Sequence, residues 1–158
     1  MYNTKEKFFK ELINCLKKLP GVGEKTAERL ALSLIEQRRD DLENFSLLLK
    51  KLPDNVHKCK ICGHLTDEDV CMICASEGRE KNSICVVEDY KSVFMFEKTG
   101  NFEGKYHVLN GVISPIDGIT PDEVNIDSLI KRIQDNTNQT EVIIALKPSI
   151  EGEATTLY

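Results

Sequence analysis

The sequence predicts a multidomain chain of the α+β class, in which a helical part, a cysteine-rich ribbon and an α/β part follow one another. Apolar residues recur at helical spacing over residues 5–52. Four cysteines fall within residues 57–76, and short apolar runs alternate with amphipathic stretches from residue 83 onward. We therefore expect domains over residues 1–56, 57–76 and 77–158, with a parallel sheet in the last of them.

The net charge of the chain indicates a possible ligand only when the first third and the rest of the chain are counted separately. The 158 residues are 41% hydrophobic and 30% charged, with a net charge of −5. Residues 1–58 hold 12 Lys and Arg against 9 Asp and Glu, whereas residues 59–158 hold 9 against 17. A surface that binds a polyanion is therefore expected in the first third of the chain. No apolar run is long enough to cross a bilayer, and residues 1–7 lack the apolar core of a secretory signal. We therefore expect a cytoplasmic protein without a membrane partner.

Three helices are predicted before residue 56. The segment Leu19-Pro20-Gly21-Val22-Gly23 separates the first from the second, and Pro53-Asp54-Asn55 ends the third. The apolar stripes of the three helices are Phe8, Phe9, Leu12, Ile13 and Leu16, then Ala27, Leu30, Ala31, Leu34 and Ile35, and then Leu42, Phe45, Leu48, Leu49 and Leu52.

The turn between the first two helices has the features of a helix–hairpin–helix DNA-binding motif. Gly21 and Gly23 permit a tight turn and a close approach of the backbone to a ligand. The free N–H groups at the start of the second helix favour an anion, and Lys25 and Arg29 stand one turn apart beside them. We expect this site to hold a DNA phosphate without reading bases. The alternative is a plain corner between two helices with structural glycines.

The four cysteines are spaced as a structural zinc site. Cys59 and Cys62 form one Cys-x-x-Cys pair, Cys71 and Cys74 form another, and eight residues separate the pairs. Two such turns supply the corners of a tetrahedral Zn²⁺ site and leave no open position for a catalytic water. A pair of disulfides is the rival interpretation, but it suits an oxidising compartment. The remaining cysteines, Cys15 and Cys85, lie in apolar stretches and are expected to be buried.

The last part of the chain alternates strands and helices. Ile84–Val87, Tyr106–Leu109 and Val142–Leu146 are the predicted strands, because each is a short apolar run. Helices are expected at Tyr90–Lys98 and Val124–Gln134, with a Gly- and Pro-rich loop over residues 111–121. The chain stops at Tyr158, two turns into a helix that begins near Glu151, so the α/β part is expected to be incomplete at its C-terminus.

Acidic residues follow two of these strands in an arrangement that is similar to the Toprim domain of topoisomerases, primases and related nucleases. Glu88 follows the first strand, and the motif Asp-x-Asp-x-Glu-Gly-Glu-Ala of type IA topoisomerases aligns without a gap on the segment after the third strand. The two aspartate positions are Lys147 and Ser149, while Glu151 and Glu153 are retained. A lysine repels a divalent cation and a serine supplies no charge, so magnesium chemistry is not expected. Glu151 and Glu153 also suit the first turn of an ordinary helix.

These three motifs, in this order, resemble the RecR family of bacterial recombination mediators over essentially the whole chain. The segments that carry the resemblance are Leu19-Pro20-Gly21-Val22-Gly23-Glu24-Lys25-Thr26-Ala27, the four cysteines, the stretch Tyr106-His107-Val108-Leu109 with Gly111, Ile113-Ser114-Pro115 and Asp117-Gly118, and Glu151-Gly152-Glu153-Ala154.

The resemblance implies a non-enzymatic function in DNA repair in the bacterial cytoplasm, at the nucleoid. Proteins of this family act with RecO and RecF to help load RecA on gapped single-stranded DNA. They assemble as dimers or ring-shaped tetramers through which DNA can pass. The family's DNA-contacting Lys and Arg correspond to Lys25 and Arg29, and its chains continue beyond Tyr158. The acidic surface that includes Glu88, Glu151 and Glu153 is expected to be either a partner-binding surface or the remnant of a metal site.

Two other functions remain open from the sequence. One is a magnesium-dependent Toprim enzyme, namely a nuclease, primase or topoisomerase, which Lys147 and Ser149 oppose. The other is a zinc-ribbon module that binds proteins and never contacts DNA.

Overall fold

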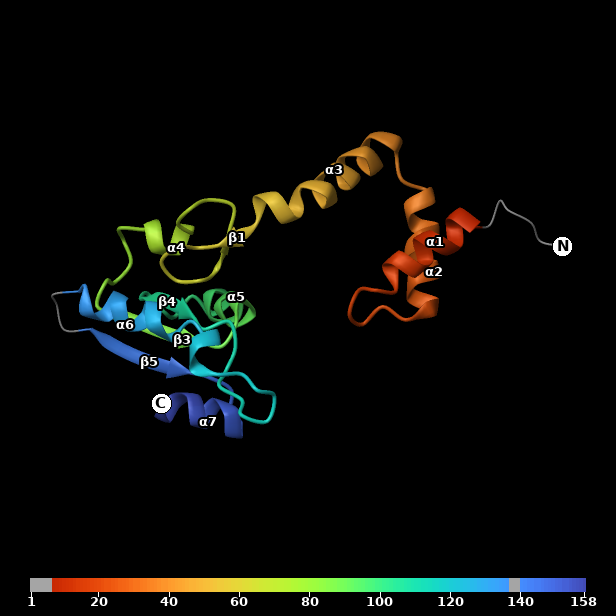
Figure 1. Ribbon diagram of the computed structural model, residues 1–158. Helices are drawn as coiled ribbons and strands as arrows, with labels where there is room; N and C mark the ends of the chain where they lie inside the picture. The colour runs from red at the N-terminus through yellow and green to blue at the C-terminus, as the bar shows by residue number, and fades with distance from the viewer. Residues whose placement is uncertain (1–6, 137–139) are drawn as a thin grey trace. The chain divides into compact units, whose positions relative to one another are not determined.

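The computed structural model describes residues 7–136 and 140–158, and these residues form two compact units that divide between Leu52 and Pro53 (Figure 1). The predicted start of the first helix at Lys5 lies outside the described residues. None of the helices in the described part of the chain has the length and apolar character that crossing a membrane requires.

The first unit is helical, as predicted. It contains α1 (Lys7–Leu16), α2 (Glu24–Ile35) and most of α3 (Arg39–Asn55), which continues through Pro53. The helices α1 and α2 pack against each other through Ile13, Ala27 and Ala31. The two alanines lie on one face of α2 with no exposed surface, and their small side chains let the two helices approach closely. The first unit therefore has a small core, which lies between α1 and α2 beside the turn that joins them.

The second unit begins with the cysteine ribbon and continues into a three-stranded parallel sheet. The ribbon contains the antiparallel strands β1 (His57–Lys58) and β2 (Leu65–Thr66) and the short helix α4 (Met72–Ala75). The sheet has the order β4-β3-β5. Its remaining elements are β3 (Ser83–Val87), α5 (Tyr90–Thr99), β4 (Lys105–Val108), the 3₁₀ turn η1 (Pro121–Glu123), α6 (Ile126–Gln134), β5 (Glu141–Ala145) and α7 (Ile150–Leu157).

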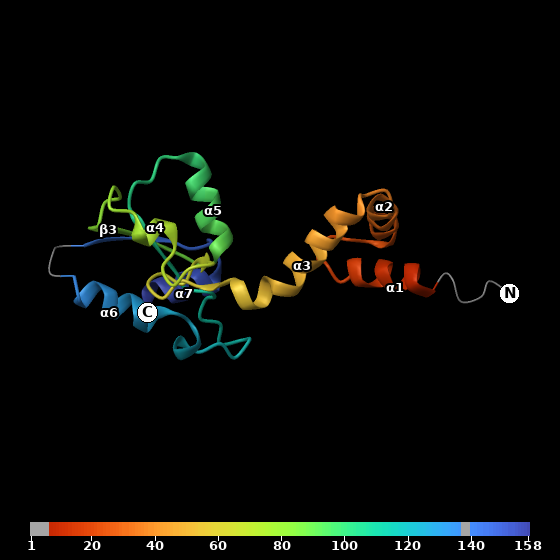
Figure 2. The same cartoon turned by 90° about the horizontal axis from the view of Figure 1, so that it is seen from above.

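The central strand β3 is buried along its whole length, which explains its continuous apolar run. Its alternate residues face two different cores. Cys85 and Val87 pack with Val93 of α5, whereas Ile84 and Val86 pack toward α6. Figure 2 shows α5 on one side of the sheet and α6 and α7 on the other. The predicted parallel α/β arrangement is therefore present.

Several element bounds differ from the sequence prediction by one or two residues, and β3 begins and α5 ends one residue outside the predicted range. Both outer strands begin and end one residue earlier than predicted. The helix expected from Val124 begins at Ile126, because the Thr120 capping box and Pro121 form the separate turn η1 just before it. Cys85 is buried as expected, but the prediction for Cys15 was wrong, since Cys15 is exposed on α1.

Close backbone packing holds α7 against the loop that precedes it. Ser149 caps the helix by accepting a hydrogen bond from the Gly152 N–H at 3.1 Å. A Cβ atom at Gly152 would lie 2.2 Å from the Lys147 carbonyl oxygen. The glycine of the Glu-Gly-Glu-Ala segment is therefore required by the fold, independently of any chemistry at the neighbouring glutamates.

Candidate metal centre and nucleic-acid interface

The two cysteine pairs come together in one buried cluster. The Sγ atoms of Cys59, Cys62, Cys71 and Cys74 all lie within 4.8 Å of one another, and those of Cys62 and Cys71 are 3.6 Å apart. Sulfur atoms at the corners of a Zn²⁺ tetrahedron with Zn–S bonds of about 2.3 Å stand ~3.8 Å apart. Among residues 7–136 and 140–158, this is the one group of three or more potential metal ligands. The four cysteines therefore fit a tetrahedral zinc ion.

Local backbone geometry brings the thiols together. The first knuckle is closed by the Gly63 N–H, which donates to the Cys59 carbonyl at 3.0 Å, and Gly63 has a φ of 75°. The Cys71 N–H donates to the Cys59 Sγ at 3.3 Å and so links the two knuckles. Cys71 also stands at the N-terminus of α4, whose single turn places Cys74 beside it. Each knuckle is thus a tight turn that presents two sulfurs to the same point.

The electrostatics of the cluster also favour a cation. The hydrogen bond between Cys62 and Cys71 lowers the pKa of the Cys71 thiol and raises the pKa of the Cys62 thiol. The thiols therefore compete for negative charge, and a divalent ion removes this competition by stabilising all four thiolates. His64 stands outside the cluster, with its ring packed edge-on against Phe94 at 5.0 Å between the centroids. The residues that could hold a metal ion are therefore the four cysteines singled out from the sequence, and their role as ligands stays a prediction.

The ribbon is fastened to the edge of the parallel sheet at strand β4. The Val108 N–H donates to the Cys62 carbonyl at 2.7 Å, and the Lys105 Nζ donates to the Cys74 carbonyl at 2.8 Å. A Cβ atom at Gly63 would lie 2.9 Å from the Val108 carbonyl oxygen. Each cysteine pair therefore has a direct hydrogen bond to β4, so the geometry of the ribbon and of this sheet edge are linked.

The predicted DNA-binding turn is exposed and has two glycines with different requirements. Gly21 has a φ of 80°, which a residue with a side chain rarely adopts. Gly23 has an ordinary φ of −82°, and a Cβ atom added there would meet no protein atom within 4 Å, so the protein's own packing does not require glycine. Gly23 stands at the N-terminus of α2, and no side chain caps that end. The first-turn N–H groups are therefore open to an external acceptor.

The two basic residues of this turn are available for a ligand. Lys25 and Arg29 are exposed on α2, and neither has an ion-pair or hydrogen-bond partner for its side chain within the described ranges 7–136 and 140–158. The nearby Lys17 is instead paired with Glu24. The structure thus shows a narrow cationic face beside open N–H groups, but it holds no DNA and leaves the assignment of Gly21, Gly23, Lys25 and Arg29 a prediction.

At the carboxyl ends of the sheet, a lysine forms an ion pair where a Toprim enzyme would carry an aspartate. Strands β3 and β5 are neighbours, and the Lys147 Nζ after β5 lies 3.0 Å from Glu88 Oε1 and 4.0 Å from Asp89 Oδ2 after β3. The hydrogen bond to Glu88 raises the pKa of Lys147. The sequence showed the loss of an aspartate at this position, but it did not reveal that the lysine would pair with Glu88.

The glutamates of this region do not form a ligand group. Glu151 and Glu153 lie in the first turn of α7, and they do not join Glu88 in any cluster of three acidic, His or Cys ligands within the described residues. Asp89, which sequence reasoning did not single out, caps α5 through the Ser92 N–H at 2.9 Å. Burial tends to raise the Asp89 pKa, but the bonds from Ser92 and the charge of Lys147 lower it overall.

The metal cluster yields a first prediction, based on the bond between Cys62 and Val108. If the cysteines bind zinc, its removal by a chelator frees the Cys62 carbonyl and accelerates amide hydrogen exchange at Val108 by at least about tenfold. The Ala27 amide, which donates to the Gly23 carbonyl at 2.9 Å in the other unit, is the internal control and should keep its protection. Unchanged exchange at Val108 after complete zinc loss would contradict the linkage.

Comparisons with known proteins agree with this geometry. Residues 9–52 match the family model of the RecR helix-hairpin-helix, residues 56–76 match that of the RecR four-cysteine zinc finger domain, and residues 82–158 match the Toprim domain. The chain is 49% identical over 147 residues to the Recombination protein RecR of Lactobacillus johnsonii, and the match covers 93% of this chain and 74% of that protein. Proteins of the same name from Lactobacillus helveticus and Lactobacillus acidophilus are 48% and 47% identical, with the same coverage. The chain belongs to the RecR family.

Proposed function

We propose that this protein is a DNA-binding recombination mediator that acts as a non-catalytic clamp or scaffold in recombinational DNA repair. In this proposal it works with RecO and RecF in the bacterial cytoplasm, at the nucleoid, to help load RecA on gapped single-stranded DNA. Membership of the RecR family supports the general role. The observation that carries the DNA-binding part is the exposed turn at Gly23, where open N–H groups lie beside two cationic side chains that pair with no other described residue.

A structural zinc ion at Cys59, Cys62, Cys71 and Cys74 is part of this proposal. The match to a four-cysteine zinc finger model and the clustering of the four sulfurs both support it. Four thiolates saturate a tetrahedral ion, so the zinc would hold the ribbon against β4 and would not activate water.

The non-catalytic part of the proposal depends on Lys147. An ammonium group 3.0 Å from Glu88 occupies the position at which a Toprim enzyme needs a divalent cation. Ser149 meanwhile serves as the cap of α7. Magnesium-dependent DNA cleavage or religation by the purified chain would refute this part.

The second prediction tests the turn directly. Replacing Lys25 and Arg29 together by Gln removes two phosphate contacts and breaks no hydrogen bond or ion pair of either side chain within the described residues. Binding of single-stranded DNA should weaken similarly for all sequences, and the slope of log K against log salt should flatten by about 1.4, at ~0.7 per contact. Fluorescence anisotropy over a salt series measures both quantities. The control is Lys98→Gln on α5, where the side chain is exposed. An unchanged slope in the double variant would remove the turn from the DNA interface.

Self-association is supported by the apolar surface of α3. None of its 17 residues is buried, and Phe45, Leu48, Leu49 and Leu52 recur at helical spacing with exposures of 47%, 59%, 54% and 53%. A contiguous exposed stripe of this kind is typical of a protein–protein interface. We propose that a second copy of the chain covers it, which would place several weakly basic turns in one assembly and multiply their charge, as in a dimer or ring tetramer.

The third prediction follows from this stripe. Leu48→Gln together with Leu52→Gln should lower the solution mass of the chain, measured by light scattering, toward that of one protomer. The matched control is Ser46→Gln with Lys50→Gln, two positions that are also four residues apart on α3 but lie off the stripe. A single-protomer mass for the unsubstituted chain at micromolar concentration would reject the proposed assembly.

The fourth prediction concerns the acidic surface. We propose that Glu151 and Glu153 present negative charge to RecO, since both stand in the first turn of α7 and neither joins a metal-ligand cluster in the described parts of the chain. Charge reversal of both to Lys should weaken RecO binding by at least about tenfold in calorimetry. Reversal of Glu77 and Glu103 to Lys changes the net charge equally and is the control. If the variant in which both glutamates are replaced by Lys still binds RecO as tightly, these glutamates contribute to helix stability alone.

A further inference from the structure

A second concentration of positive charge lies in the otherwise acidic unit. A groove with a volume of about 590 Å³ runs between the cysteine ribbon and α6. Five basic side chains from four separate segments line it, and we call it the cationic groove. These residues are Lys60 of the first knuckle, Lys81 before β3, Lys105 of β4, and Lys131 and Arg132 of α6. One carboxylate, that of Asp135, lines it with them.

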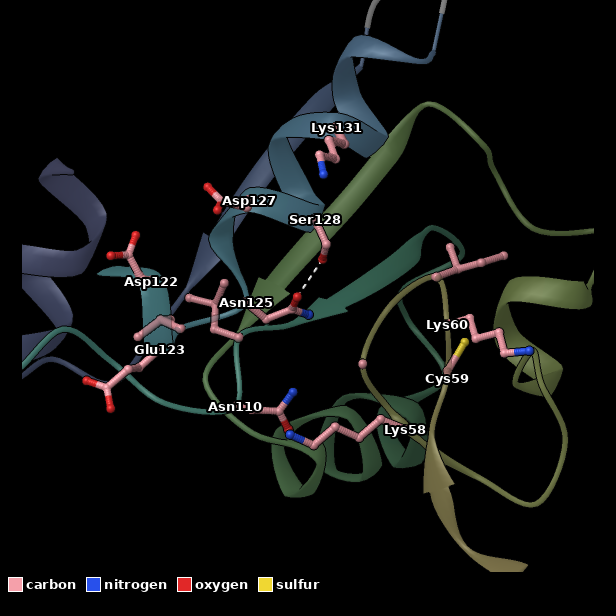
Figure 3. Close-up of a pocket in the computed structure, with 14 residues that line it drawn as sticks. Lys58, Cys59, Lys60, Asn110, Asp122, Glu123, Asn125, Asp127, Ser128 and Lys131 are labelled. Carbon is pink, nitrogen blue, oxygen red and sulfur yellow. Dashed lines mark hydrogen bonds between the residues drawn. The ribbon is translucent and has the colours of Figure 1, made fainter. Parts of the chain in front are cut away.

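The concentration is unusual for this part of the chain. Residues 59–158 contain 17 Asp and Glu against 9 Lys and Arg, and five of those nine line this one groove. Figure 3 shows the neighbouring surface, with Lys131 and Ser128 on the side of α6 that faces the Cys59–Lys60 segment, while the Asp127 side chain points the other way. Like charges repel when they are placed together, so their convergence suits a ligand of opposite sign.

Most of these cations have no carboxylate partner. The Arg132 Nη1 donates to the Tyr106 carbonyl at 2.7 Å, and the Lys105 Nζ donates to the Cys74 carbonyl. Backbone oxygens therefore position both groups without neutralising them. Lys60 is paired with Asp69 at 2.7 Å. Within residues 7–136 and 140–158, the side chains of Lys81 and Lys131 have no hydrogen-bond or ion-pair partner.

The charge of a zinc site does not account for the groove. Four thiolates around Zn²⁺ carry about −2. Lys58 and Lys60 flank Cys59 in the sequence, and Lys105 contacts the Cys74 carbonyl. Because Lys60 is also paired with Asp69, these three lysines leave a net charge of about +2, which balances the metal site. Lys81, Lys131 and Arg132 remain, and they line an open groove in which an external anion can reach them.

We propose that the cationic groove is a second contact site for the phosphate backbone of a nucleic-acid strand, distinct from the turn at Gly23. The groove has no aromatic ring in its lining, so it offers no platform for stacked bases. Its donors are ammonium groups and one guanidinium, which bind phosphates without regard to sequence. This inference rests on the proposed function insofar as the protein is taken to bind nucleic acid, but it does not require contact at Lys25 or Arg29.

The test uses the full, zinc-loaded chain and three double variants. Lys81→Gln with Lys131→Gln removes two of the five positive charges that line the groove and breaks no side-chain hydrogen bond or ion pair within the described residues. Lys91→Gln with Lys98→Gln removes the same charge from exposed positions on α5 and is the matched control. Lys25→Gln with Arg29→Gln reports on the turn separately. Binding of a labelled oligo-dT strand, and of a duplex of equal length, is measured by anisotropy across a salt series, and zinc per chain is measured for every variant.

The groove variant should bind the single strand several-fold more weakly, with a log–log salt slope flatter by about 1.4 for two contacts, or by ~1.8 if the duplex is the ligand. The α5 control should keep the original slope, and every variant should keep its zinc. If the groove variant loses affinity and the turn variant does not, then the turn assignment fails and the groove stands.

A groove variant that binds both DNA forms as the unsubstituted chain does overturns the inference, whatever the turn variant shows. Poly-glutamate serves as the second probe. If the groove variant loses affinity for poly-glutamate while its DNA slope is unchanged, the groove takes an acidic protein segment and the inference is equally overturned. An equal loss in the α5 control would show a general effect of net charge and would also reject the site.

Discussion

The second unit depends on the attachment of the first cysteine knuckle to strand β4. The Val108 N–H belongs to an outer strand of the sheet, and its acceptor is the carbonyl of a proposed zinc ligand, Cys62. One such hydrogen bond contributes only about 1 kcal/mol. Zinc binding by four thiolates contributes about 10–16 kcal/mol in isolated zinc-finger peptides, which is comparable to the whole stability of a domain. The metal would therefore fix the knuckle first, and the knuckle in turn fixes the edge of the sheet and one wall of the cationic groove.

The ion pair of Lys147 adds little to the stability of the fold. Its side chain is 64% exposed, and solvent-exposed pairs of this kind contribute about 0–1 kcal/mol. The effect of Lys147 on metal binding is larger than its effect on stability. Its positive charge replaces a carboxylate at the point where two parallel strands end. The sheet keeps the geometry of a ligand site at the carboxyl ends of its strands. At that site a lysine stands beside Glu88 and Asp89 in place of one carboxylate, and this replacement opposes the metal chemistry of Toprim enzymes.

The sequence was most informative where chemistry depends on short spacing along the chain. Tandem Cys-x-x-Cys pairs predicted a cluster that the structure forms, since each pair needs only one tight turn. The apolar run of β3 predicted a central strand, because a strand buried on both faces has no polar side. The cationic groove could not be predicted in this way. Lys81 and Lys131 are 50 residues apart in the sequence, and only the packing of α6 beside the ribbon brings them together. Cys15 was predicted to be buried because its neighbours are apolar, but it lies off the face of α1 that carries Ile13.

Because the charged residues are unevenly distributed, the net charge of the chain does not indicate whether a particular surface binds nucleic acid. At physiological ionic strength, charges separated by more than about 8 Å are largely screened in solvent. A phosphate in the cationic groove therefore interacts mainly with the charged side chains that line it, which are Lys60, Lys81, Lys105, Lys131, Arg132 and Asp135. The excess of acidic residues in residues 59–158 acts at longer range and opposes nonspecific association, most strongly at low salt. An acidic unit with one cationic groove is thus compatible with nucleic-acid binding that is confined to a defined surface. A uniformly basic unit would bind the same strand in many orientations.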